Sequence, residues 1–191
     1  MAGTSNPWDD RYAFDGYLFG EAPNAFLASQ VHRLKPGWRA LAVADGERRN
    51  GVWLAEQSLL VESIDGSAVA QAKARRLADA RSVAMDLTLA DLSLWEWPER
   101  QFDVVVAIFI QFAPPMLRTE LFAGMVKALK PEGLLMLQGY RPEQLQYGTG
   151  GPSSIENLYT VALLRDAFPS LELLALTAHD AVIHEGIHRH F

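Results

Sequence analysis

Residues 41–51 read Leu41-Ala42-Val43-Ala44-Asp45-Gly46-Glu47-Arg48-Arg49-Asn50-Gly51, and the rest of the chain is best understood from here. An apolar run ends at Asp45-Gly46, a charged turn follows, and helical spacing begins at Val52. This order predicts a strand, a tight turn and a helix, and in an open α/β sheet a ligand binds at such a turn. Gly46 lets the backbone approach that ligand closely. With one glycine in the turn, a nucleotide-type site and a plain connection remain equal alternatives on this stretch alone.

The composition describes a globular protein without thiol chemistry. The 191 residues are 49% hydrophobic and 21% charged, which suits one domain with a sizeable core. The net charge of −6 argues against a nucleic-acid partner. The lack of cysteine excludes a disulfide scaffold and a thiolate metal site. No apolar run approaches the roughly 20 residues that span a bilayer. The N-terminus lacks a signal-peptide pattern, so we expect a cytoplasmic protein without a membrane partner.

Strand and helix patterns alternate along the chain. Strands are predicted over 39–44, 60–64, 83–89, 102–110, 134–137 and 171–183, with helical patterns between them. The strongest strand, FDVVVAIFI at Phe102–Ile110, is apolar at almost every position, as in the middle of a parallel sheet. We therefore expect a Rossmann-like α/β fold, with a doubly wound, mostly parallel sheet and helices on both faces. One domain, 1–191, accounts for the whole chain.

Residues 1–22 are rich in aromatic side chains and turn formers and sustain no regular period. The aromatic residues in question are Trp8, Tyr12, Tyr17 and Phe19. They either pack an N-terminal arm onto the body of the protein, or form a lid over the cleft at the strand ends. The core of the domain then spans 23–191.

Polar residues stand at the ends of the predicted strands, which meet at one edge of a parallel sheet. Asp65 follows Gly46 by 19 residues, the spacing at which a carboxylate accepts hydrogen bonds from ribose hydroxyls. The alternative for Asp65 is an Asx turn with Gly66. Asp91 either accepts an adenine amino proton or caps a turn. Because no phosphate-binding signature is present and the site is acidic, a cationic adenosyl ligand such as S-adenosylmethionine suits it better than a pyrophosphate.

Several motifs together resemble those of class I S-adenosylmethionine-dependent methyltransferases. They are VADGERRN at 43–50, the strand end at Asp65, Asp91-Leu92, FDVVVAIF at 102–109 and LKPEGLLMLQGY at 129–140. More narrowly, YLFGEAPNAFL at 17–27 and PEQLQYGTGGP at 142–152 resemble the small bacterial branch near the tellurite-resistance and thiopurine methyltransferases. The resemblance implies S-adenosylmethionine as cofactor, bound by Asp45, Gly46, Glu47, Asn50, Asp65, Gly66, Ser67, Asp91, Leu92 and Ile108.

The resemblance further implies in-line methyl transfer to a small-molecule acceptor such as a thiol or chalcogen. No residue is assigned as catalytic, and acceptor-side candidates are Gln111, Tyr140, Arg141 and Tyr147. We expect no metal site and either a monomer or a homodimer.

Two departures from the family pattern shape the alternatives. Arg48 stands where the family has a second turn glycine, and it either leans away from the cleft or fills the place of the cofactor. The last antiparallel strand of the family is expected to be shortened or missing. A non-catalytic module that binds an adenosine ligand or a partner therefore remains an alternative function. A nicotinamide-dependent oxidoreductase fits less well, because the acidic turn repels a pyrophosphate.

Overall fold

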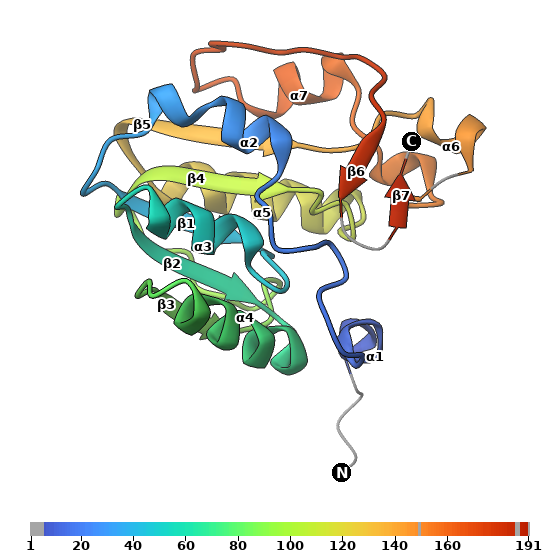
Figure 1. The fold of residues 1–191 in the computed structure, drawn as a ribbon. Helices are drawn as coiled ribbons and strands as arrows, with labels where there is room; N and C mark the ends of the chain where they lie inside the picture. Colours follow the sequence, from blue (N-terminus) through green and yellow to red (C-terminus); the bar gives the residue numbers. More distant parts are fainter. Residues whose placement is uncertain (1–5, 149, 186–187, 191) are drawn as a thin grey trace.

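The computed structural model describes residues 6–148, 150–185 and 188–190, with side chains up to residue 182. Its main sheet has five strands in the order β3-β2-β1-β4-β5, and every pairing is parallel. The strands are β1 (Arg39–Val43), β2 (Leu60–Asp65), β3 (Asp86–Leu89), β4 (Phe102–Ile108) and β5 (Leu129–Gln138). The order reverses between β1 and β4, so the carboxyl ends of these strands flank a topological switch point (Figure 1). The predicted Rossmann-like fold is confirmed.

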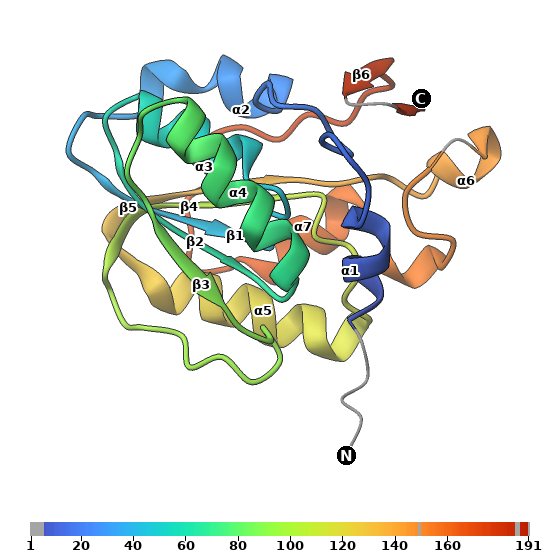
Figure 2. The same ribbon diagram turned by 60° about the horizontal axis from the view of Figure 1, so that its bottom comes forward.

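Helices cover both faces of this sheet (Figure 2). The α-helices are α1 (Pro7–Tyr12), α2 (Ala25–Ser29), α3 (Arg49–Glu56), α4 (Ala68–Ala80), α5 (Pro115–Ala128), α6 (Gln144–Tyr147) and α7 (Val161–Ala167). Two 3₁₀ helices follow α2 and α6: η1 (Val31–Arg33) and η2 (Ile155–Asn157). Asn24 and Ser67 cap α2 and α4 through their side-chain oxygens, as their place before apolar helical patterns predicts. None of the helices in the described ranges is long and apolar enough to cross a membrane.

The central strand β4 is buried on both faces, as its continuous apolar run predicts. Val105 packs into the cluster beneath α5 and α7, whereas Val104 and Val106 pack into the cluster beneath α2 and α3. Trp95 and Trp97 anchor the loop before β4 against the first of these clusters. Because β4 is packed on both faces, its carboxyl end and the residues that follow it are held in place.

The second half of the chain differs from the sequence prediction in several places. The predicted strand 171–183 is wrong: β6 (Ile183–Glu185) pairs only with β7 (His188–His190), in a separate antiparallel hairpin. Leu173 and Leu174 are adjacent, and both are more than half exposed, so the apolar run lacks the alternation that a half-buried strand requires. Within the described residues, the main sheet ends at β5 on this side.

Three local predictions also need correction. Lys130–Gly133 forms a bulge inside β5, not a turn before it, since Phe102 pairs with Leu129 and Val104 with Leu134. The spacing of Leu158, Val161, Leu164 and Phe168 predicts one helix from Ser154, but the segment is divided into η2 and α7, because the Thr160 side chain accepts from the Leu163 N–H and begins a new helix. Helical spacing also predicts Met116 on the same face as Leu121 and Met125, but Met116 is 81% exposed in the first turn of α5.

Candidate functional site

A cavity of about 690 Å³ lies at the carboxyl ends of β1, β2 and β4, which is the size range of small-molecule sites. The cavity is lined by residues from the predicted set Asp45, Gly46, Asn50, Asp65, Gly66, Asp91, Leu92 and Ile108. The N-terminal arm, of which residues 6–22 are described, closes one side with Trp8, Tyr12 and Phe19. Strand ends, the first turn of α3 and the arm thus converge on one space.

The turn between β1 and α3 approaches this cavity through its backbone. Gly46 has a φ of 55°, and its N–H donates to Asp65 Oδ2 at 2.8 Å. A Cβ at this position would lie 2.6 Å from the Tyr12 hydroxyl oxygen, closer than van der Waals contact allows. The glycine therefore meets two requirements at once, a left-handed backbone and room beside the arm.

Asp65 combines the two roles that the sequence left open. Its Oδ1 accepts from the Ser67 N–H at 2.8 Å, which is an Asx-type turn, while its Oδ2 holds the Gly46 N–H. The side chain lines the cavity at the same time. Burial raises the pKa of Asp65, and the two N–H donors oppose that rise. Asp65 thus ties the end of β2 to the turn after β1.

Asp91 is the more exposed carboxylate of the cavity. Its Oδ1 accepts from the Ser93 N–H at 2.9 Å and from the Ser93 hydroxyl at 2.7 Å. These hydrogen bonds hold the pKa of Asp91 below its usual range, so the group is charged at neutral pH. The turn-capping alternative is therefore present in the structure, and the residue nevertheless lines the cavity.

Arg48 does not line the cavity. Its φ of 71° confirms that the position requires the left-handed conformation that the family meets with glycine. The side chain is fully buried behind the turn, where Nη1 donates to the backbone carbonyl of Ser63. Of the two alternatives for Arg48, the structure supports the one that leaves the cleft open, although the side chain is buried and not solvated.

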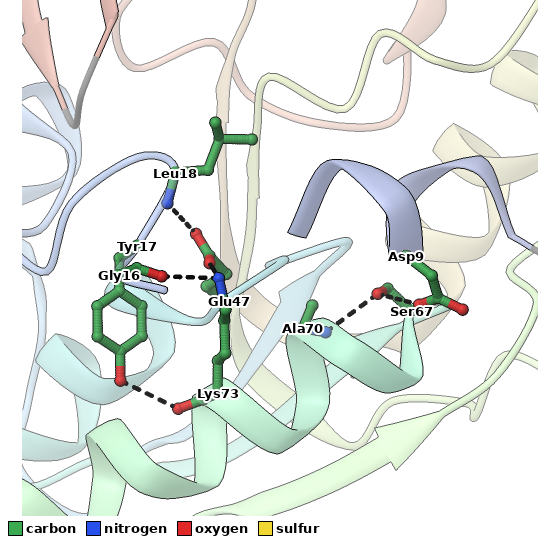
Figure 3. Close-up of polar contacts among 8 residues, drawn as sticks. All are labelled: Asp9, Gly16, Tyr17, Leu18, Glu47, Ser67, Ala70 and Lys73. Atoms are coloured by element: carbon green, nitrogen blue, oxygen red, sulfur yellow. Dashed lines mark hydrogen bonds and ion pairs between the residues drawn. The ribbon is translucent and has the colours of Figure 1, made fainter. Parts of the chain in front are cut away.

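Glu47 was predicted as a cofactor contact, but its carboxylate points to the N-terminal arm (Figure 3). Oε2 accepts from the Leu18 N–H at 2.6 Å, and Oε1 pairs with Lys73 Nζ at 2.7 Å. Lys73 also donates to the Gly16 carbonyl at 2.7 Å and lies 4.2 Å from the centre of the Phe14 ring. Glu47 and Lys73 therefore form a buried ion pair that fastens the arm to the turn and to α4. We call these two residues the arm clamp.

A second contact fastens the arm at α1. The Ser67 hydroxyl donates to Asp9 Oδ1 at 2.5 Å and also caps α4 by accepting from the Ala70 N–H (Figure 3). Ser67 is not part of the cavity lining, and its predicted cofactor contact stays a prediction. Tyr17, predicted in the lid, also lies outside the lining and donates its hydroxyl proton to the Lys73 carbonyl.

The four acceptor-side candidates are not brought to the cavity. Gln111 is buried and bridges the backbone: Nε2 donates to the Tyr140 carbonyl at 2.8 Å, and Oε1 accepts from the Tyr140 N–H at 2.5 Å. Arg141 and Tyr147 both bind Asp180, at 2.6 and 3.1 Å. These residues hold the loop after β5 in place, because their polar groups are paired within the protein.

Ten further lining residues were not predicted from the sequence. They are Asn6, Pro7, Val43, Ala44, Arg49, Ala90, Val106, Phe109, Ile110 and Phe112. Phe109 and Ile110 end the strongest predicted strand and Phe112 follows it closely, and that position was the available signal. Arg49 brings a cation to a lining that also holds Asp45, Asp65 and Asp91. The lining therefore contains three carboxylates and one arginine, and Glu47, which was expected among them, does not line the cavity.

The described part of the lining contains no histidine, lysine or cysteine. The one phenol, Tyr12, is buried, and burial together with nearby carboxylates raises its pKa far above neutral pH. Among the described residues no group of three His, Cys, Asp or Glu side chains is placed to hold a metal ion. The described lining thus offers shape, aromatic walls and carboxylates, and Asp45, Asp65 and Asp91 are its groups able to accept a proton.

The parallel sheet, the switch-point cavity and the acidic residue after β2 define a Rossmann-like protein with a nucleoside-type ligand site. Residues 40–133 match the family model described as a methyltransferase domain. The matched stretch runs from β1 into the bulge of β5 and includes the turn, Asp65 and Asp91. No curated protein sequence matches the chain.

Several solved structures have a similar fold. A structure from echinomycin biosynthesis, concerned with conversion of a disulfide bond into a thioacetal group, has a TM-score of 0.69 at 20% identity, over 84% of this chain and 75% of that one. A Geobacter sulfurreducens S-adenosylmethionine-dependent methyltransferase, in complex with S-adenosyl-L-homocysteine, has a TM-score of 0.62 at 16% identity, over 86% and 70%. A TehB-like methyltransferase from Corynebacterium glutamicum has 0.51 at 22%, over 68% and 67%. These solved structures share the fold of this chain, and residues 40–133 match the methyltransferase-domain family model.

Proposed function

We propose that the protein transfers the methyl group of S-adenosylmethionine to a small-molecule acceptor. The observation that carries the proposal is the junction of Gly46 and Asp65, joined by a 2.8 Å hydrogen bond at the floor of a cavity of ligand size. The methyltransferase-domain match covers this junction, and the Geobacter structure of the same fold was solved with S-adenosyl-L-homocysteine. The acidic lining suits a ligand that carries a positive sulfonium.

The chain's own residues fit such a ligand. Asp65 keeps lone pairs for ribose hydroxyls after accepting two N–H groups, since each carboxylate oxygen accepts more than one hydrogen bond. Asp91, Leu92 and Ile108 all line the cavity and would hold the adenine. Gly46 has no Cβ, which would contact the Tyr12 hydroxyl, so the backbone of the turn can lie close to a ligand. Arg49, the cation of the lining, suits the ligand's carboxylate.

The proposed acceptor end, formed by Phe109, Ile110 and Phe112, is apolar, and none of these three side chains can accept a proton. When bound, S-adenosylmethionine would supply a methyl group on a positively charged sulfur. Phe109, Ile110 and Phe112 exclude water and orient an apolar acceptor. An acceptor that is already an anion needs no proton removed, so a thiolate or a comparable chalcogen anion fits this end best. Membership of the branch near the tellurite-resistance and thiopurine methyltransferases would agree with that chemistry and with the similar fold of the TehB-like structure.

An acceptor panel tests the proposed function. With S-adenosylmethionine labelled in its methyl group, we expect transfer to aromatic thiols, halides or chalcogen oxyanions and at least about 100-fold less transfer to amines and alcohols of matched shape, because one missing general base removes about 10²–10⁴-fold in rate. Transfer to thiols should rise with pH through the thiol's own pKa. Preferential methylation of amines would contradict the proposed acceptor class. Tight cofactor binding without transfer to any acceptor would favour the non-catalytic binding module instead.

A further inference from the structure

Arg48 carries a charge in a place where water does not reach it. The side chain is 0% exposed, and only Nη1 has a hydrogen bond, to the carbonyl of Ser63. Nε and Nη2 have no partner among the described residues. A buried guanidinium with incomplete hydrogen bonding is expensive unless a nearby negative charge offsets it. The turn must therefore contain such a charge.

Asp45 supplies that charge from the same turn. Both of its hydrogen bonds within the described structure use Oδ2, which accepts from the Ser63 hydroxyl at 3.1 Å and from the Gly51 N–H at 2.9 Å. Ser63 thus contacts Arg48 through its carbonyl and Asp45 through its hydroxyl. One residue of β2 joins the buried cation to a carboxylate that lines the cavity.

Other ionisable groups from the surrounding elements complete the electrostatic setting of this pair. They are Tyr12 of α1, Glu47 and Arg49 of the turn and α3, Asp65 of β2, and Lys73 and Arg75 of α4. Glu47 and Lys73 pair with each other, so their charges largely cancel. Asp65 repels Asp45, and Arg48 is the cation that offsets them both.

We propose that Arg48 is a positioning residue that keeps Asp45 ionised behind the cofactor turn, so that the cavity presents a carboxylate to a sulfonium ligand at neutral pH. The ligand part of this inference rests on the proposed function, whereas the Arg48–Asp45 coupling does not.

The direction of the effect follows from burial and charge. Burial raises the pKa of Asp45 to about 6, although Arg48, the Gly51 N–H and the Ser63 hydroxyl all act to lower it. A nearby opposite charge typically changes a carboxyl pKa by about 1–3 units. Without Arg48, Asp45 would titrate about one pH unit or more higher and would be largely protonated at neutral pH.

The test is the pH dependence of S-adenosylmethionine affinity, measured by calorimetry from pH 5 to 8.5. We expect the wild-type affinity to fall as pH drops through about 6, in step with the pKa of Asp45. Arg48→Met should move that midpoint upward by about one pH unit or more, and Arg48→Lys should bring it back towards wild type. Asp45→Asn, which keeps both acceptor contacts, should flatten the profile. A lower affinity at every pH with an unmoved midpoint would mean that Arg48 is only structural and would overturn the proposal.

Unfolding of the ligand-free protein separates this inference from the proposed function. Because folding raises the pKa of Asp45, protonation of Asp45 stabilises the fold below its unfolded pKa of about 4, and this stability is lost as pH rises through about 6. Urea denaturation should show this loss in wild type, a smaller loss in Asp45→Asn, where the raised pKa of Asp65 still contributes, and a loss that extends to higher pH in Arg48→Met. If Arg48→Met does not fold, Arg48→Lys must retain the wild-type profile and Asp45→Asn must show the smaller loss. An equal pH profile in wild type and Asp45→Asn would overturn the coupling, whereas failure to bind cofactor at any pH would overturn only the proposed function.

Discussion

Gly46→Ala is expected to lower the affinity for S-adenosylhomocysteine by about 100-fold or more. The backbone at Gly46 has a φ of 55°, and a Cβ there would lie 2.6 Å from the Tyr12 hydroxyl oxygen. Tyr12 is buried and stacks on Trp8, so it has little room to move. Left-handed strain of about 1–2 kcal/mol and overpacking of about 1–3 kcal/mol together amount to about 2–5 kcal/mol, a range that includes the roughly 2.7 kcal/mol of a 100-fold change. Calorimetric titration of the variant gives the ratio directly.

Gly148→Ala is the matched control for this variant. Gly148 has a φ of 61°, yet a Cβ there would meet nothing within 4 Å, so it carries similar backbone strain far from the cavity lining. Its cofactor affinity should equal that of wild type. Adding Tyr12→Phe to Gly46→Ala removes the closest oxygen and leaves a ring carbon at 3.3 Å, so part of the affinity should return. Wild-type affinity in Gly46→Ala would show that the ligand does not use this turn.

Lys73→Met is expected to lower the free energy of unfolding by about 3–5 kcal/mol, the usual loss when one partner of a buried ion pair is removed. Lys73 and Glu47 side chains are 5% and 3% exposed, and their closest atoms are 2.7 Å apart. Methionine has a similar length but removes the cation over the Phe14 ring and leaves the Glu47 carboxylate buried without its partner. Urea denaturation at neutral pH measures the loss.

Lys130→Met is the corresponding surface variant. Lys130 and Asp103 pair at 2.8 Å, but their side chains are 38% and 21% exposed, so water screens the pair. Its loss should be about 1 kcal/mol or less. The double variant Lys73→Met with Glu47→Gln should recover part of the stability, since no unpaired charge is then buried. Equal losses in the two lysine variants would argue against the arm clamp as a major contribution to stability.

The elements that local patterns specify were predictable from the sequence. β1, the turn, α3 and β2 follow from adjacent residues whose periodicity and turn chemistry agree, and the same residues place Asp45, Gly46 and Asp65 at strand ends. Phe102–Ile108 was predictable because a fully buried strand is apolar on both faces. The parallel order of the sheet then brings these strand ends to one cavity.

Features that depend on distant partners were not predictable in the same way. Glu47 looks like a ligand contact in the sequence, and only its pairing with Lys73, 26 residues away, shows that it holds the arm. Gln111 stands at a strand end but satisfies the backbone of Tyr140, 29 residues away. The apolar run 171–183 resembles a strand, although in the fold its leucines are largely exposed and it pairs with none of the main-sheet strands.

The direction of the Arg48 side chain could not be predicted from the sequence, but the structure shows it. Arg48 has a φ of 71°, in the left-handed region where glycine is favoured. Sequence alone does not show where the seven side-chain atoms of an arginine go from such a backbone. The guanidinium lies behind the turn against Ser63, and the cavity in front of the turn is open.

Titration calorimetry of the wild-type protein with S-adenosylmethionine, S-adenosylhomocysteine and NAD tests the central claim most directly. We predict saturable heat with both adenosyl ligands, none with NAD, and a loss of about tenfold or more in Asp65→Ala, because a charge-assisted hydrogen-bond acceptor contributes about 1.5–3 kcal/mol. Absence of heat with both adenosyl ligands, or tighter binding of NAD, would contradict the assignment of this cavity to a methyltransferase cofactor.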